Sequence, residues 1–100
     1  MPGDHADEME TSLMMHLRPD LVRPLSEAGA GHERKSKIEA MQKGWLWAER
    51  SWSQISADTG MGDSKAATSG KGRLFFEAVT TKLAAMYVEV CLADTTDLYE

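Results

Sequence analysis

The stretch SKAATSGKGRLFFEAVTTKLAAMYVEVCL, residues 64–92, has the most regular pattern in the chain and decides the fold that we expect. Its apolar side chains recur at the spacing of one helix face, at Phe75, Val79, Leu83, Met86 and Val90. A helix of about 28 residues would be about 42 Å long. Gly70 and Gly72 each cost about 1 kcal/mol against Ala inside a helix, so we expect irregular first turns. The pattern predicts a long C-terminal helix.

The N-terminal region is predicted to form a shorter helix. Asp4 suits the N-cap position, and Asp7 and Glu8 would then lie at the positive end of the helix dipole. The expected buried face consists of Met9, Leu13, Met14 and Leu17. Pro19 should end this helix at the residues just before it, because proline disfavours the α conformation in the preceding residue.

The middle of the chain has weaker patterns. Residues 33–43 could form a short helix, with Ile38 and Met41 as its apolar pair. Residues 45–57 contain three tryptophans, which favour strands, but the alternation is broken, so one strand and a hairpin are both possible. Residues 58–63 (DTGMGD) should form a turn, because glycine permits positive φ. We therefore expect a mostly helical chain with one or two short strands.

Composition excludes several classes of protein. One hundred residues correspond to one domain or a piece of one, and the net charge of −5 disfavours nucleic-acid binding. The longest apolar run, residues 83–88, is far shorter than the roughly 20 residues of a membrane span. The acidic N-terminus is unlike a signal peptide, and the single Cys91 cannot form an internal disulfide. These features predict a cytoplasmic protein with neither a membrane nor a nucleic acid as partner.

The stretch GDHADEMETS, residues 3–12, holds the residues best suited to chemistry. A His followed by carboxylates three and five residues later could transfer a proton or bind a metal ion. His5 and Glu8 would share a helix face, whereas Glu10 would lie about 140° round from His5 if both were helical. The alternative interpretation is a solvated acidic segment with an incidental histidine.

Four other features have ordinary structural explanations. His16 lies on the flank of the apolar stripe and fits a packing residue better than a ligand. Residues 69–72 (SGKG) fail the phosphate-loop pattern, because Lys65 replaces its first glycine and Gly72 its Ser or Thr. Cys91 is predicted to be an inert core thiol, and the tryptophans could line either a pocket or a core.

The same N-terminal stretch carries a resemblance to a known family. Residues 3–15 (GDHADEMETSLMM) followed by residues 18–22 (RPDLV) resemble the C-terminal third of the creatininase (creatinine amidohydrolase) family. Downstream, Gly44-Trp45, Arg50-x-Trp52 and the Thr-Gly-x-Gly-Asp of residues 59–63 occur in the family's order. The combined pieces are fairly specific, and the resemblance covers essentially the whole chain from Pro2.

The resemblance implies an α/β fold with αβα layers, of which residues 1–100 would be the C-terminal part of a single domain. It also implies a metal-dependent hydrolase that opens cyclic amides, with Zn or Mn as the divalent metal and a homo-oligomer, usually a hexamer, as the assembly. By position, His5 matches the catalytic histidine that carries a proton to the leaving nitrogen, and Glu10 matches a glutamate that orients it. Family members are about two and a half times longer, and their metal ligands would lie before Met1.

Two hypotheses follow for the function. The first is the C-terminal part of a creatininase-like amidohydrolase that contributes His5 and Glu10 but no metal ligand, so that the isolated chain binds no metal and is inactive. The second is a small non-catalytic interaction domain that uses the long C-terminal helix and the tryptophan cluster as its binding face.

Overall fold

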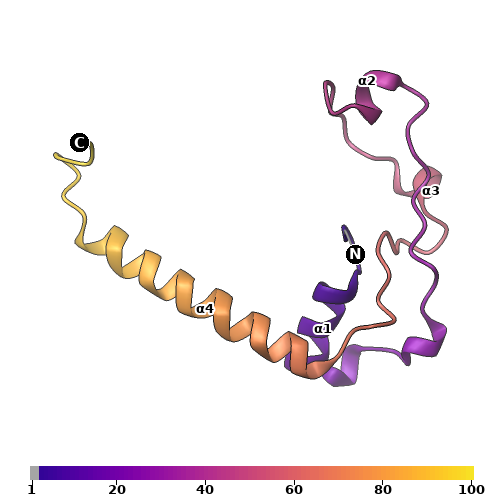
Figure 1. Ribbon diagram of the computed structural model, residues 1–100, viewed down its shortest axis with the longest axis horizontal. Coiled ribbons are helices and arrows are strands. Elements are labelled where there is room, and N and C mark those ends of the chain that lie inside the picture. The colour runs from indigo at the N-terminus through magenta and orange to yellow at the C-terminus, as the bar shows by residue number, and fades with distance from the viewer. Residues whose placement is uncertain (1–2) are drawn as a thin grey trace.

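Helix α4 (Ser69–Leu92) is the longest element of the computed structural model, which describes residues 3–100. Five shorter elements precede it: α1 (Glu8–Leu17), the 3₁₀ turns η1 (Pro19–Leu21) and η2 (Leu25–Glu27), α2 (Glu39–Gln42) and α3 (Trp52–Ile55). Figure 1 shows α1 beside the start of α4, while α2 and α3 lie in long loops on the other side of the molecule. The predicted long C-terminal helix is confirmed.

Helix α4 begins later than residue 64, and its first turns are regular despite two glycines. Thr68 is the N-cap, and its hydroxyl accepts a hydrogen bond from the Lys71 backbone N–H at 3.2 Å. Such a cap satisfies one of the helix's unpaired N–H groups. The irregular start predicted for residues 64–92 holds for residues 64–68, which are not helical, whereas residues 69–72 form regular helix despite the two glycines.

Helices α1 and α4 cross at Ser12 and Gly72. A Cβ at Gly72 would lie 1.8 Å from the Ser12 carbonyl oxygen, so only glycine permits this approach. Ser12 is 2% exposed, and its hydroxyl accepts a hydrogen bond from the Thr68 N–H at 3.0 Å. Lys71 adds an ion pair with Glu8 across the same crossing. At the crossing itself, the two helices are thus joined by polar contacts and close backbone packing.

Helix α1 begins at Glu8 rather than directly after Asp4. Asp7 is the N-cap and accepts a hydrogen bond from the Glu10 N–H at 2.8 Å. The helix ends at Leu17, ahead of Pro19, as predicted. Its predicted buried face is wrong for Met9, Met14 and Leu17, which are exposed. Leu13 is half-buried, and Ser12 is the buried residue. The reason is that α4 covers α1 only at the crossing.

The middle of the chain is less regular than expected. Helix α2 is a single turn rather than a helix over residues 33–43, and residues 45–57 contain the short helix α3. The one or two short strands are not confirmed, since residues 3–100 contain no strand. A strand needs a neighbouring strand to satisfy its backbone, and this part of the chain offers none. The turn at 58–63 forms, but its positive φ falls at Thr59 (67°), not at a glycine.

The described part of the chain buries little apolar surface. Its surface is 8276 Å², whereas a compact protein of this mass would have about 5,700 Å². The radius of gyration is 18.4 Å, against about 13 Å for a compact domain of 100 residues. Among residues 3–100, the buried apolar side chains are Met61 and Ala67. Figure 1 shows that the second half of α4 extends away from the rest of the chain. Leu83, Met86 and Val90 of the α4 stripe are accordingly all exposed.

Candidate active site

His5 lies in a bend before α1 instead of within a helix. Ala6 has a positive φ of 55°, which turns the chain between His5 and the helix. The His5 carbonyl accepts a hydrogen bond from the Met61 N–H at 2.9 Å, which ties the bend to the 58–63 turn. The backbone of His5 is therefore held from a segment more than fifty residues away. The expectation that His5 and Glu8 share a helix face is wrong for this reason.

Glu10 is the third residue of α1, and its carboxylate folds back over the bend. Its Oε2 accepts a hydrogen bond from the Ala6 N–H at 2.7 Å and lies 4.0 Å from His5 Nδ1. The longer distance exceeds that of a hydrogen bond. Together with the Asp7 cap, this arrangement resembles a capping box that reaches one residue further than usual. Glu10 thus has a structural role at the helix start as well as proximity to His5.

Three further residues form linked contacts beside His5. The Trp52 ring meets the imidazole edge-on, with ring centroids 5.0 Å apart at 64°. Arg50 binds both carboxylate oxygens of Asp4, at 3.1 Å from Nη2 to Oδ1, and its guanidinium lies 5.2 Å from the Trp52 ring. Asp4, expected as a helix cap, therefore serves as an ion-pair partner. The Arg50 hydrogen bonds hold the pKa of Asp4 below its ordinary value of 3.8.

The three tryptophans do not act as one group. Trp52 is 39% exposed and contacts His5, whereas Trp45 and Trp47 are 76% and 81% exposed. Lys43 lies over the Trp45 ring at 5.0 Å. Neither predicted role, a pocket lining or a core, describes the three together. The Arg50-x-Trp52 motif singled out these two residues in the sequence. Their spacing alone could not predict that they would lie beside Asp4 and His5.

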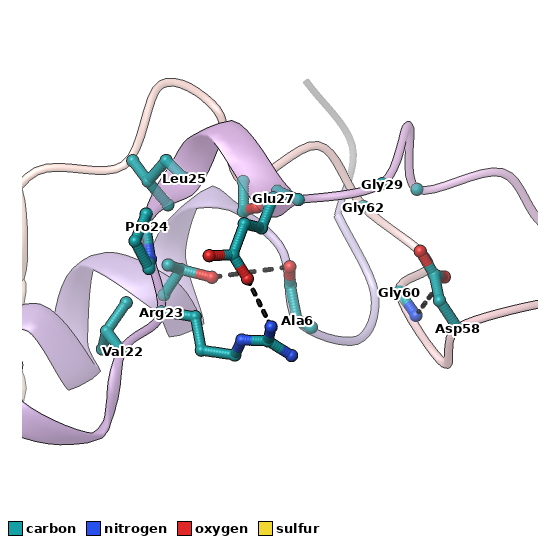
Figure 2. Close-up of a pocket in the computed structure, with 14 residues that line it drawn as sticks. Ala6, Val22, Arg23, Pro24, Leu25, Glu27, Gly29, Asp58, Gly60 and Gly62 are labelled. Carbon is teal, nitrogen blue, oxygen red and sulfur yellow. Dashed lines mark hydrogen bonds and ion pairs between the residues drawn. The ribbon is translucent and has the colours of Figure 1, made fainter.

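A cavity of about 320 Å³ lies behind the bend and is lined by both polar and apolar groups. Figure 2 shows Ala6, Arg23, Glu27 and Asp58 around it, with an ion pair between Arg23 and Glu27. Ala6 and Thr11 line this cavity, and they directly follow the predicted site residues in the sequence. His5 and Glu10 do not line it. The candidate site is therefore the half-exposed surface around His5, and the cavity adjoins it.

The remaining candidates behave as ordinary structural residues. His16 packs against the Phe76 ring on α4, with centroids 5.7 Å apart, as a packing residue should. Lys71 is held by Glu8 and by the Ala66 carbonyl at 2.8 Å, which is a helix-crossing role. Cys91 is exposed near the end of α4, so the prediction of a core thiol is wrong. The cause is again that nothing covers this half of the helix.

The described residues form neither a metal-binding cluster nor a membrane-spanning helix. Within residues 3–100, no three His, Cys, Asp or Glu side chains lie close enough together to hold a metal ion. This part of the chain therefore does not fit a metal centre. In the same range, no helix is both long and apolar enough to cross a bilayer.

Comparison with known proteins identifies the family. The family model described as creatinine amidohydrolase matches residues 2–87. A crystal structure of a protein named "Putative creatinine amidohydrolase", from Bacteroides fragilis NCTC 9343, is similar at 39% identity with a TM-score of 0.84. The match covers 98% of this chain and 37% of that one. A comparison with the curated proteins found no match. The chain belongs to the creatininase family of amidohydrolases, and it spans little more than a third of the solved relative.

Proposed function

We propose that this chain supplies the proton-transfer histidine of a metal-dependent amidohydrolase that opens cyclic amides. The observation that supports this best is the pairing of His5 with Glu10, at 4.0 Å between Nδ1 and Oε2, inside the matched region of the family. Hydrolysis of an amide requires a proton on the leaving nitrogen, and a half-exposed imidazole can deliver it. The Glu10 carboxylate would stabilise the charged imidazolium that precedes delivery.

The metal of such a site would be held by residues other than those described. The divalent ion, Zn or Mn by family resemblance, supplies polarisation of the amide and an activated water. Residues 3–100 offer no ligand cluster for it, so we derive no step through the metal. We propose that the metal ligands come from a polypeptide that corresponds to the part of the relative's chain outside the matched 37%. The α4 face and the His5 surface would pack against that polypeptide, and the homo-oligomer stays a prediction.

A chimeric enzyme tests this proposal. The 100-residue chain would replace the matching 37% of the Bacteroides fragilis protein, and hydrolysis of a panel of cyclic amides would be measured with Zn or Mn. We expect His5→Ala to lower kcat by ~10²–10⁴, the range for a lost general acid or base. Bound metal should remain unchanged, because His5 is assigned to proton transfer.

Two controls make the result decisive. His32→Ala removes an exposed histidine outside the site and should leave kcat unchanged. The 100-residue chain alone should show no metal-dependent turnover. A His5→Ala chimera that loses its metal would identify His5 as a ligand, and one with full kcat would refute the proposed role.

A further inference from the structure

The imidazole of His5 has few contacts that could fix its orientation. Among residues 3–100, no side chain or backbone group forms a hydrogen bond with the ring, and Glu10 stands 4.0 Å away. The bound partner of Glu10 Oε2 is the Ala6 N–H. A histidine that moves a proton must present one nitrogen to its substrate. An imidazole free to rotate would therefore transfer the proton more slowly. Another group must therefore restrain it.

Trp52 is the group in position to do so. Its ring meets the imidazole edge-on at 5.0 Å between centroids, within the range of favourable aromatic pairs. The Nδ1 atom of the same imidazole lies 4.0 Å from Glu10 Oε2. Trp52 is the first residue of α3, a single helical turn that could not hold the side chain rigidly by itself.

Arg50 supplies the missing restraint. Its guanidinium lies 5.2 Å from the Trp52 ring while its two terminal nitrogens bind the two oxygens of Asp4. Asp4 directly precedes His5 in the chain. The four side chains of Asp4, Arg50, Trp52 and His5 therefore close a loop, which we call the Arg50 clamp. The planar guanidinium suits this double role, because it can donate two hydrogen bonds to a carboxylate and still stack on an aromatic ring.

We propose that Trp52 is a positioning residue for His5 and that the Arg50–Asp4 ion pair keeps Trp52 in place. The inference rests on the proposed proton transfer by His5, but the contact itself can be tested without it. Trp52 acts through the imidazole and needs no contact with the substrate.

The first test measures the contact in the 100-residue chain. Diethyl pyrocarbonate modifies neutral imidazole, and mass spectrometry would give separate rates for His5, His16 and His32 at low protein concentration. Trp52→Leu should raise the His5 rate toward that of an unstructured peptide, and Arg50→Gln should raise it in the same direction. The rates of His16 and His32 serve as internal references, and Trp47→Leu is the matched control at an exposed tryptophan. Peptide-like reactivity of His5 in the unaltered chain, or an unchanged rate in Trp52→Leu, would overturn the clamp.

The second test measures positioning in the chimeric enzyme. Trp52→Leu should lower kcat by ~10–100-fold with little change in KM, the expected cost of misplacing a catalytic group by about 1 Å. Trp52→Phe keeps an aromatic edge and should recover most of the loss, whereas Arg50→Lys keeps the charge without the fork and should not. A general folding defect would reduce active enzyme in Trp52→Phe and Trp52→Leu alike, and that pattern would refute positioning.

The two tests separate this inference from the proposed function. A chimera in which His5→Ala keeps full kcat rejects the proton-transfer role, while the modification rates still report whether the clamp exists. If instead His5→Ala abolishes turnover and Trp52→Leu leaves kcat unchanged, the proposed function survives and the positioning role is rejected.

Discussion

Gly72 of α4 lies directly against the backbone of Ser12 in α1, where an added Cβ would come within 1.8 Å of the Ser12 carbonyl oxygen. The obstructing atom belongs to backbone, so no side-chain rotation could relieve the contact. This approach lets the Thr68 N–H reach the Ser12 hydroxyl. One missing side chain thus sets the distance between the two helices that anchor the fold.

Gly72→Ala should destabilise the helix pair despite the better helix propensity of alanine. Forcing a methyl group into a closed contact costs ~1–3 kcal/mol. Gly70→Ala is the matched control, because open space surrounds Gly70 and alanine should be neutral or stabilising by up to ~1 kcal/mol there. Urea denaturation followed by helical circular dichroism would compare the two. Equal effects at both positions would contradict the close crossing.

Ser12→Ala should destabilise the same crossing through a lost hydrogen bond. The Thr68 N–H would lose its partner, and the loss of such a part-buried hydrogen bond costs ~0.5–1.5 kcal/mol. Ser69→Ala, at an exposed serine beside Thr68, is the control and should change the denaturation midpoint little. A Ser12→Ala midpoint equal to that of the control would show that the hydroxyl contributes nothing.

The Asp4–Arg50 ion pair should persist from neutral pH into mild acid. Arg50 lowers the pKa of Asp4 in the folded state below 3.8, so the pair's contribution is fully present above that pH. The contribution should decline only as the pH falls through the lowered folded-state pKa. The measurement is the difference in unfolding midpoint between the unaltered chain and Asp4→Asn over a pH series, with Arg50→Gln expected to give the same profile. A difference that disappears between pH 7 and pH 5 would contradict the assignment.

The isolated chain should self-associate and bind hydrophobic dyes. The described chain exposes about 2,600 Å² more surface than a compact protein of its mass, and the uncovered half of α4 contributes apolar side chains to it. Sedimentation velocity would show association, and dye fluorescence would show the exposed apolar surface. Met86→Lys with Val90→Lys should reduce association, whereas Thr81→Lys adds a charge at a polar position and should have less effect. A monomer that binds no dye would contradict this expectation.

Local signals in the sequence determined the elements of secondary structure that depend on interactions between residues close in the chain. The apolar period of residues 64–92 predicted α4, Pro19 predicted the end of α1, and the 58–63 segment formed its turn. Each depends on backbone preferences or nearest-turn contacts that the residues carry with them. The family resemblance was also contained in the sequence, since the motif of residues 3–15 lies inside the matched region.

Only the tertiary structure decided which residues surround His5 and which faces are covered. Asp4 has the chemistry of a helix cap, but Arg50, 46 positions away, binds it instead. The glycines at 70 and 72 look alike in sequence, yet only Gly72 meets another helix. The strand expectation at 45–57 failed for a similar reason: strand formation depends on a partner, and local propensity cannot supply one. Contacts between segments distant in the chain depend on how the elements pack, and a local sequence pattern does not determine that packing.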